Sequence, residues 1–149
     1  MASLIPETFR SGSRFAFCLL FILALFSNEV SATHNRAGEI TYRYIGPPPS
    51  WTYEVTIITY TKTSSSAADR PSLDSVYWGD GSPPVVFHRI LKEDLGNDIS
   101  RNTYINYHTY NGNGNFLIHF EDPNRNSGVV NIPGSVEVPF YVSTELNIN

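Results

Sequence analysis

Apolar and polar side chains alternate with a period of two through most of the chain after residue 32. In the segment 39–44 the even positions are Ile or Tyr, whereas the odd positions are charged or Thr. The segments 51–61, 116–121 and 136–148 alternate in a similar way. A period of two places successive side chains on opposite faces of a strand. The pattern therefore predicts half-buried β-strands, with one face packed and the other in solvent.

Turn-forming residues separate these predicted strands. Gly and Pro interrupt the alternation at 46–50, 79–84, 111–115, 122–128 and 133–134. The segments 39–44 and 51–61 are expected to form a hairpin around the first of these breaks. Further strands are expected at 75–78, 85–90, 103–110 and 129–132. The segment 91–102 carries charges without a clear period, so it predicts a loop.

About seven or eight short strands without an amphipathic helix predict an all-β fold, an antiparallel β-sandwich. The chain has 149 residues, of which 41% are hydrophobic, enough for one core. Its one Cys, Cys18, cannot form a disulfide within the chain, so core and sheet must supply the stability. The expected core consists of Ile40, Tyr42, Tyr53, Val55, Ile57, Trp78, Phe116, Ile118, Phe120, Val138 and Phe140.

The sequence of residues 1–32 predicts a secretory signal peptide, a helix that precedes the sandwich. Arg10 and Arg14 precede an apolar run over 15–26, which is too short to cross a bilayer as a helix. The sequence Val30-Ser31-Ala32 then predicts cleavage after Ala32. We expect a domain over 33–149 that is exported through the inner membrane and is secreted or exposed on the cell surface. An uncleaved N-terminal anchor is the alternative.

Charge and motifs argue against nucleic-acid binding and catalysis. The formal net charge is −4, whereas nucleic acid requires a basic face. The sequence contains no Gly-x-Ser-x-Gly, nucleotide-binding loop or His-Glu-x-x-His motif. The adjacent carboxylates at 93–94 and 121–122 lie in predicted loops or turns. We therefore expect a non-enzymatic protein without a cofactor, and consider a small glycosidase or peptidase the least favoured class.

One segment has the spacing of the start of a calcium loop. Asp122, Asn124 and Asn126 occupy alternate positions. However, Gly128 falls one place late, and Pro133 stands where the loop needs a bidentate Glu. Asp, Pro, Asn and Gly also form ordinary turns. We expect a plain turn, and a calcium site with Asp122, Asn124 and Asn126 is the alternative.

A second motif joins two distant segments. Tyr77-Trp78-Gly79-Asp80-Gly81-Ser82 is followed by His108-Thr109-Tyr110, by Gly114 and by an alternating strand. We expect Trp78 to point into the core, Asp80 to form an Asx turn, and His108 and Tyr110 to lock the following strand. These roles are structural.

The order of these residues resembles the polycystic-kidney-disease (PKD) domain, an immunoglobulin-like sandwich. The Asp-Phe that this family usually has between the Trp and the first Gly is missing here, and the spacer from Ser82 to His108 is long. The resemblance implies a PKD-like domain.

A longer series of motifs resembles the N-terminal region of large gliding-motility-associated surface proteins of Bacteroidetes. The motifs are 32–42, 53–56, 59–62, 68–70, 78–81, 108–110 and 121–126. The resemblance implies a surface protein with further β-domains and a C-terminal sorting domain for type IX secretion. No sorting domain is present, and the last predicted strand still alternates near Asn149. We therefore expect the N-terminal part of a longer surface protein or a truncated reading frame.

Tyr104, Tyr107 and Tyr110 lie close together in the sequence beside the Asn-Gly turn. An exposed row of aromatic rings stacks on sugars, whereas Tyr is also a common half-buried strand residue. The sequence is therefore compatible with two functions. We favour a spacer, adhesion or protein-contact module whose partners are other domains or surface proteins. A carbohydrate-binding module that contacts polysaccharide through these tyrosines is the alternative.

Overall fold

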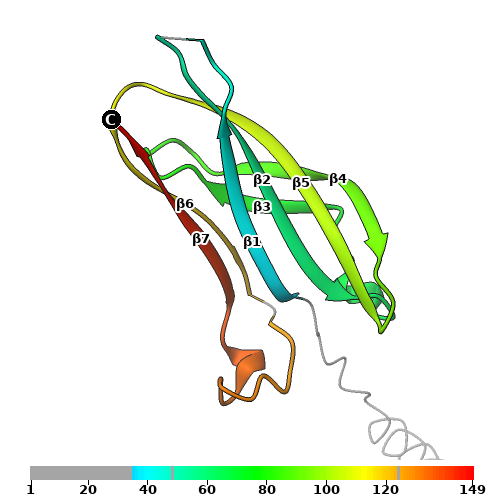
Figure 1. Ribbon diagram of the computed structural model, residues 1–149. Coiled ribbons are helices and arrows are strands. Elements are labelled where there is room, and N and C mark those ends of the chain that lie inside the picture. The colour runs from blue at the N-terminus through cyan, green and yellow to red at the C-terminus, as the bar shows by residue number, and fades with distance from the viewer. Residues whose placement is uncertain (1–34, 48, 124) are drawn as a thin grey trace, which may run out of the picture. The chain divides into compact units, whose positions relative to one another are not determined.

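The computed structural model describes residues 35–47, 49–123 and 125–149 (Figure 1). The predicted signal peptide, its cleavage point and Asn124 lie outside these residues. The described residues form strands and two 3₁₀ turns, and none of their segments is a helix long and apolar enough to cross a membrane. The strands are β1 (Asn35–Tyr44), β2 (Trp51–Lys62), β3 (Ser72–Tyr77), β4 (Val85–Asp94), β5 (Ile99–Tyr110), β6 (Gly114–Asp122) and β7 (Phe140–Ile148), and the 3₁₀ turns are Ser66–Ala68 and Ser135–Glu137.

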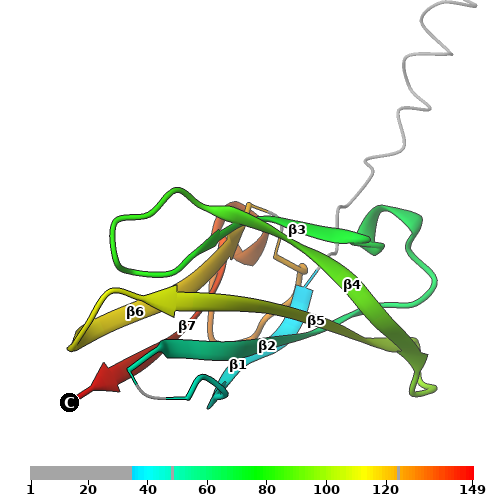
Figure 2. The ribbon, with the colours of Figure 1, turned by 90° about the horizontal axis from the view of Figure 1, so that it is seen from above.

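The strands form one antiparallel sheet in the order β1-β2-β5-β4-β3-β6-β7, which confirms the prediction of an all-β antiparallel fold. β4 changes partner along its length. Up to His88 it pairs with β3, and from Arg89 it pairs with β5. The sheet therefore folds over at β4, and Figures 1 and 2 show β3 in a layer apart from β1, β2 and β5.

The two edge strands of this sheet, β1 and β7, come close to each other. Six successive antiparallel strand pairings lead from β1 to β7, so these two strands run in the same direction. The Tyr42 hydroxyl donates a hydrogen bond to the backbone carbonyl of Glu145 across the gap, at 3.1 Å. The sheet is therefore nearly closed.

The longest ladder joins β2 to β5, from the pair Trp51–Tyr110 to the pair Lys62–Ile99. Thr, Ile, Val and Tyr fill much of β2, and such side chains pack well on a pleated surface. The predicted hairpin is confirmed, because β1 pairs with β2 in a register that sets Ile40 opposite Ile57.

The core contains most of the residues that the alternation predicts. Fifteen buried side chains form one cluster: Ile40, Tyr53, Val55, Ile57, Leu73, Val76, Trp78, Phe87, Tyr104, Tyr110, Ile118, Phe120, Phe140, Leu146 and Ile148. Two predicted members are wrong, since Tyr42 is 40% exposed and Val138 is 38% exposed. Tyr42 lies on an edge strand, and Val138 lies before β7 begins, where strand parity does not apply.

Two predicted secondary structures are also wrong. The expected loop 91–102 is largely a β-hairpin, because β4 continues to Asp94 and β5 starts at Ile99. The connecting turn is closed by the Leu95 amide on the Ile99 carbonyl and by positive φ angles at Asn97 and Asp98. Most side chains at the end of β4 are exposed on both faces. The sequence there therefore does not alternate between apolar and polar residues.

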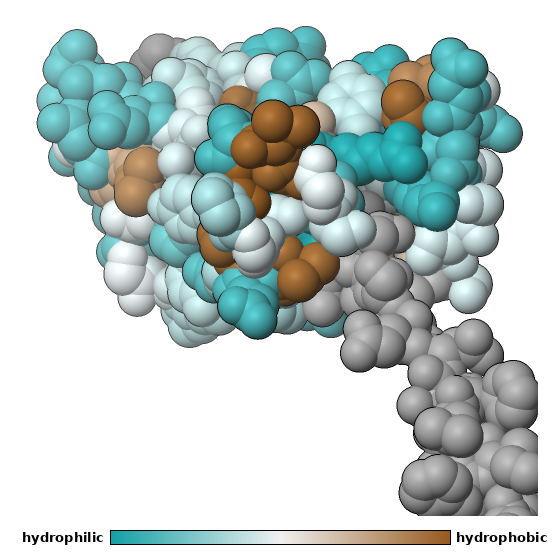
Figure 3. Space-filling view, turned by 90° about the horizontal axis from the view of Figure 1, so that it is seen from below, coloured by the Kyte–Doolittle hydropathy of each residue, from teal (hydrophilic) through white to brown (hydrophobic). Residues whose placement is uncertain are grey.

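The expected strand 129–132 is instead a turn within the β6–β7 connection. The Ile132 amide donates to the Val129 carbonyl, and no strand is assigned there. Pro133 and Gly134 end the run before it reaches a partner strand. Val130, Val136 and Val138 of this connection are exposed. Figure 3 shows hydrophobic side chains gathered on the face seen from below, the end of the molecule where Figure 1 places this connection.

The core assignment predicts different responses of two isoleucines to truncation. Ile57 is fully buried in β2, whereas Ile90 on β4 is 60% exposed. Ile57→Ala should lower the free energy of unfolding by about 2–5 kcal/mol, because it leaves a cavity. Ile90→Ala should change it by less than about 0.5 kcal/mol. Urea denaturation followed by tryptophan fluorescence measures both, and equal losses would contradict the assignment.

Candidate functional site

Trp78 lies directly after β3 and is the centre of a compact aromatic group. Its side chain is buried, as the sequence predicts. The His108 ring, from β5, stacks on the indole at a centroid distance of 4.6 Å and an interplanar angle of 9°. Phe87 of β4 also contacts the indole. The Tyr110 hydroxyl donates to the backbone carbonyl of Trp78 at 3.1 Å. Side chains from β4 and β5 therefore hold the end of β3.

Asp80 connects the β3–β4 turn to β5. One carboxylate oxygen accepts hydrogen bonds from the Ser82 amide, at 3.0 Å, and from the Ser82 hydroxyl, at 2.6 Å, which forms the expected Asx turn. The other oxygen lies 2.7 Å from Nε2 of His108. An ionised carboxylate only accepts hydrogen bonds, so Nε2 of His108 carries the hydrogen. Asp80 therefore orients the ring that stacks on Trp78.

These contacts change the acidity of Asp80. Desolvation by burial raises its pKa, but the hydrogen bonds from the Ser82 side chain, His108 and the Ser82 amide outweigh this effect. The pKa falls from 3.8 to about 2. Asp80 is therefore ionised at neutral pH, and its charge contributes to the stability of the turn.

Ser82, Asp80 and His108 are the three residue types of a hydrolase triad, but their connectivity differs from that of a triad. A triad requires the hydroxyl to donate to the imidazole, which then takes its proton. Here the Ser82 hydroxyl donates to Asp80, and the carboxylate lies between the other two side chains. The arrangement clamps a turn, and the imidazole of His108 bonds to Asp80 rather than to the serine.

Gly79 and Gly81 let this turn close. Both have positive backbone φ angles, +82° and +84°, which residues other than Gly rarely adopt. A Cβ on Gly79 would lie 2.5 Å from the backbone nitrogen of Leu117 in β6, whereas a Cβ on Gly81 would meet open space. Gly114, the third glycine of the predicted motif, starts β6, where a Cβ would lie 2.8 Å from the ring of Phe116.

The three tyrosines predicted to contact a glycan do not form an exposed row. Tyr104 and Tyr110 are buried, and Tyr107 is 56% exposed. Residues 104 and 110 have the same parity on β5, so both face the core, whereas 107 faces solvent. Tyr104 donates its hydroxyl hydrogen to the Arg70 carbonyl instead. The structure therefore leaves only Tyr107 of this trio accessible to a glycan.

The calcium candidates also have structural partners. The Asp122 carboxylate is 5% exposed, lies 3.0 Å from Nε of Arg70 and accepts a hydrogen bond from the Asn35 amide. Asn126 donates to the carbonyl of Ser127. Among the described residues, no three His, Cys, Asp or Glu side chains gather in a way that could hold a metal ion.

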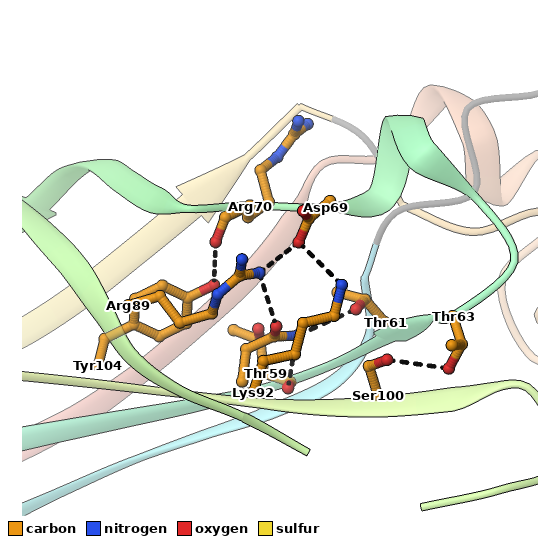
Figure 4. Close-up of polar contacts among 10 residues, drawn as sticks. Thr59, Thr61, Thr63, Asp69, Arg70, Arg89, Lys92, Ser100 and Tyr104 are labelled. Atoms are coloured by element: carbon orange, nitrogen blue, oxygen red, sulfur yellow. Dashed lines mark hydrogen bonds and ion pairs between the residues drawn. The ribbon is translucent and has the colours of Figure 1, made fainter. Parts of the chain in front are cut away.

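The sequence did not predict a polar network that runs from the exposed Asp69 and Lys92 to the buried Asn102 (Figure 4). Asp69 forms ion pairs with Arg89 and with Lys92 of β4. Arg89 also donates to Asn102 of β5, whose amide group donates to Thr61. The network fixes the segment before β3 on β4 and β5. The sequence holds one indication of this network. Residues 100 and 102 are polar but have the same strand parity as Tyr104, so they share its buried face.

Comparisons with known proteins find no match. No family model matches the chain, and neither a curated protein nor a solved structure is significantly similar to it.

The turn geometry predicts different effects at its two glycines. Gly81→Ala adds only the cost of a left-handed backbone, about 1–2 kcal/mol. Gly79→Ala adds the same cost and a clash with the β6 backbone, so it should lose about 1–3 kcal/mol more. Thermal or urea unfolding of the two variants measures the difference. Equal losses would show that β6 does not pack against this turn.

The lowered pKa of Asp80 predicts a loss of stability in acid. A pKa lower in the folded than in the unfolded state stabilises the fold above the unfolded value, about 4, and this contribution disappears as the pH falls towards 2. Solvent screening limits the contribution to at most about 2 kcal/mol. Asp80→Asn should reduce stability at neutral pH and flatten its decline between about pH 5 and 2.

The measurement is urea unfolding of both proteins across that pH range. Asp74→Asn is the matched control, because Asp74 is exposed and lies outside the Asp80–His108 contact. Parallel pH curves for the wild type and Asp80→Asn would contradict the assignment.

Proposed function

We propose that the chain is a non-enzymatic β-sandwich module of a secreted or cell-surface protein, with a spacer, adhesion or protein-contact role. The observation that carries the proposal is that the polar side chains around Trp78 are engaged in hydrogen bonds within the fold. Asp80 binds both Ser82 and His108, and Tyr110 binds the backbone carbonyl of Trp78. These contacts stabilise a turn between strands, which is what a mechanical or binding scaffold requires.

The strand order supports an immunoglobulin-like, PKD-like fold for this module. Immunoglobulin constant-type domains have strands A, B, E and D in one sheet and C, F and G in the other. With β1 to β7 named A to G, the order here is A-B-E-D followed by C-F-G. Trp78 directly follows β3, the counterpart of strand C, on which immunoglobulin domains carry a buried Trp.

The sequence supports the cellular part of the proposal. The predicted signal peptide supports export, and the ordered motifs resemble gliding-motility-associated proteins that use type IX secretion. We therefore propose a surface protein of this class, with other domains or surface proteins as partners.

A carbohydrate-binding role is the second candidate, on a different set of rings. Tyr77, His119 and Tyr141 form a stack across β3, β6 and β7, with centroid distances of 4.6 and 5.6 Å. Both tyrosines are exposed. However, rings that stack on one another have fewer free faces for a sugar. We therefore favour the scaffold role.

Export and surface exposure test the main proposal. The full-length chain with a C-terminal epitope tag, expressed in its native cells, should yield a protein that begins at Thr33. Protease added to intact cells should degrade it, while a cytoplasmic marker survives. A product that retains residues 1–32 and stays protected until the cells are lysed would contradict the proposal.

Polysaccharide binding distinguishes the two candidate roles. The scaffold role predicts no retention of the purified protein on a panel of insoluble polysaccharides. Retention that is lost in Tyr141→Ala and kept in Tyr107→Ala would instead establish the ring stack as a sugar site. Tyr107→Ala is the matched control, because Tyr107 is also exposed and lies on β5, outside the stack.

A further inference from the structure

A groove opens where β3 and β6 separate. In the described part of the chain, β3 pairs with β6 only through Val76 and Tyr77. Upstream, β3 pairs with β4 alone, and beyond Phe120 β6 pairs with β7 alone. Residues of both diverging segments line the same groove. Residues 72–75 of β3 therefore have a strand partner only on the side of β4.

The groove is large enough for a few residues of extended chain. Its volume is about 480 Å³, and its lining comes from residues 69–75 and 120–123. This volume lies within the range of about 300–1,000 Å³ that is usual for ligand sites. The buried side chains of Leu73 and Phe120 give it an apolar part.

The walls of the groove are held by polar contacts. The Arg70 guanidinium lies 3.0 Å from the Asp122 carboxylate, which ties the segment before β3 to the end of β6. The Tyr104 hydroxyl donates to the Arg70 carbonyl at 2.7 Å, and Arg89 binds Asp69. A groove with fixed walls costs less entropy to fill than one that must first be ordered.

The charge of the lining favours a basic occupant. Four lining residues are acidic and one is basic. Asp69 and Asp122 form ion pairs with Arg or Lys side chains of the chain itself. Asp74 and Glu121 are exposed on opposite walls, and no ion pair found among the described residues includes either. Asp74 accepts a hydrogen bond from the Ser72 hydroxyl at 2.7 Å, a neutral partner that leaves its negative charge uncompensated.

We propose that this groove binds an extended peptide segment of another protein, which adds as a short strand beside β3 and places a Lys or Arg between Asp74 and Glu121. Unpaired strand edges offer N–H and C=O groups to such a segment, as in other cases of strand addition. The site rests on the proposed protein-contact role and names its partner chemistry. Its failure would leave surface exposure, tested separately, unaffected.

Three fluorescein-labelled peptides test the site on protein purified after expression of the full-length sequence. The basic probe is Thr-Val-Lys-Val-Lys-Val-Thr, the acidic probe replaces Lys by Glu, and the third is the basic probe with alternate amides N-methylated. Fluorescence anisotropy should show saturable binding of the basic probe only. Binding of the acidic or the methylated probe with equal affinity would overturn the proposal, as would no binding of the basic probe.

A double variant tests the two carboxylates. Asp74→Asn with Glu121→Gln should weaken binding of the basic probe by roughly fivefold, the loss of two exposed charge pairs. Glu39→Gln with Glu137→Gln removes the same charge from exposed positions outside the groove and should leave binding unchanged. Equal effects of the two double variants would contradict the site.

Amide chemical shifts of the wild-type protein locate the probe independently of any variant. Addition of the basic probe should shift the signals of residues 72–75 and 121–122. Shifts confined to the free edges of β1 or β7 would place strand addition elsewhere and overturn the proposal.

Discussion

The change of partner along β4 is the constraint on which the two-layered structure depends. Hydrogen bonds to β3 up to His88 and to β5 from Arg89 make one strand part of both layers. With no disulfide possible within the chain, this strand and the contacts around Trp78 hold β3 against β5. The carboxylate of Asp80 adds a third connection, since it binds both its own turn and the ring of His108.

The same constraint explains why β3 has free space beside β6. β3 has six residues, and its first residues follow β4 across the fold while β6 follows β7. The two strands therefore share only one short stretch of pairing, and the polar contacts of Arg70 and Asp122 hold the diverging ends. The change of partner along β4 therefore both holds β3 in the fold and leaves the edge of β3 as a candidate binding site.

Much of the fold follows from local sequence, and the parts that do not have identifiable reasons. Alternation at 51–61 and 116–121 predicts β2 and β6, because each has one face in the core and these residues are strong strand formers. The end of β4 lacks that signal, because its side chains there are largely exposed. The partner change at His88 depends on long-range register, which no local pattern encodes.

The residues around Trp78 were predictable as a group because the motif order gives Trp78, Asp80, His108 and Tyr110 mutually compatible structural roles. For the tyrosine trio the sequence left both an exposed row and half-buried strand positions open, and strand parity sends 104 and 110 inward. The Asp69–Arg89 network and the groove depend on which segments meet in space. Their residues are ordinary surface types, so composition alone does not reveal them.

The shared direction of β1 and β7 has a mechanical consequence. β1 begins and β7 finishes at opposite ends of the described domain, as Figure 1 shows for the C-terminus. Tension applied between Asn35 and Ile148 would therefore act along the strands, and the β1–β2 and β6–β7 ladders would be loaded in shear. In shear, many hydrogen bonds must break together, whereas peeling breaks them one at a time. A domain with this geometry is suited to transmit force without unravelling from its edges.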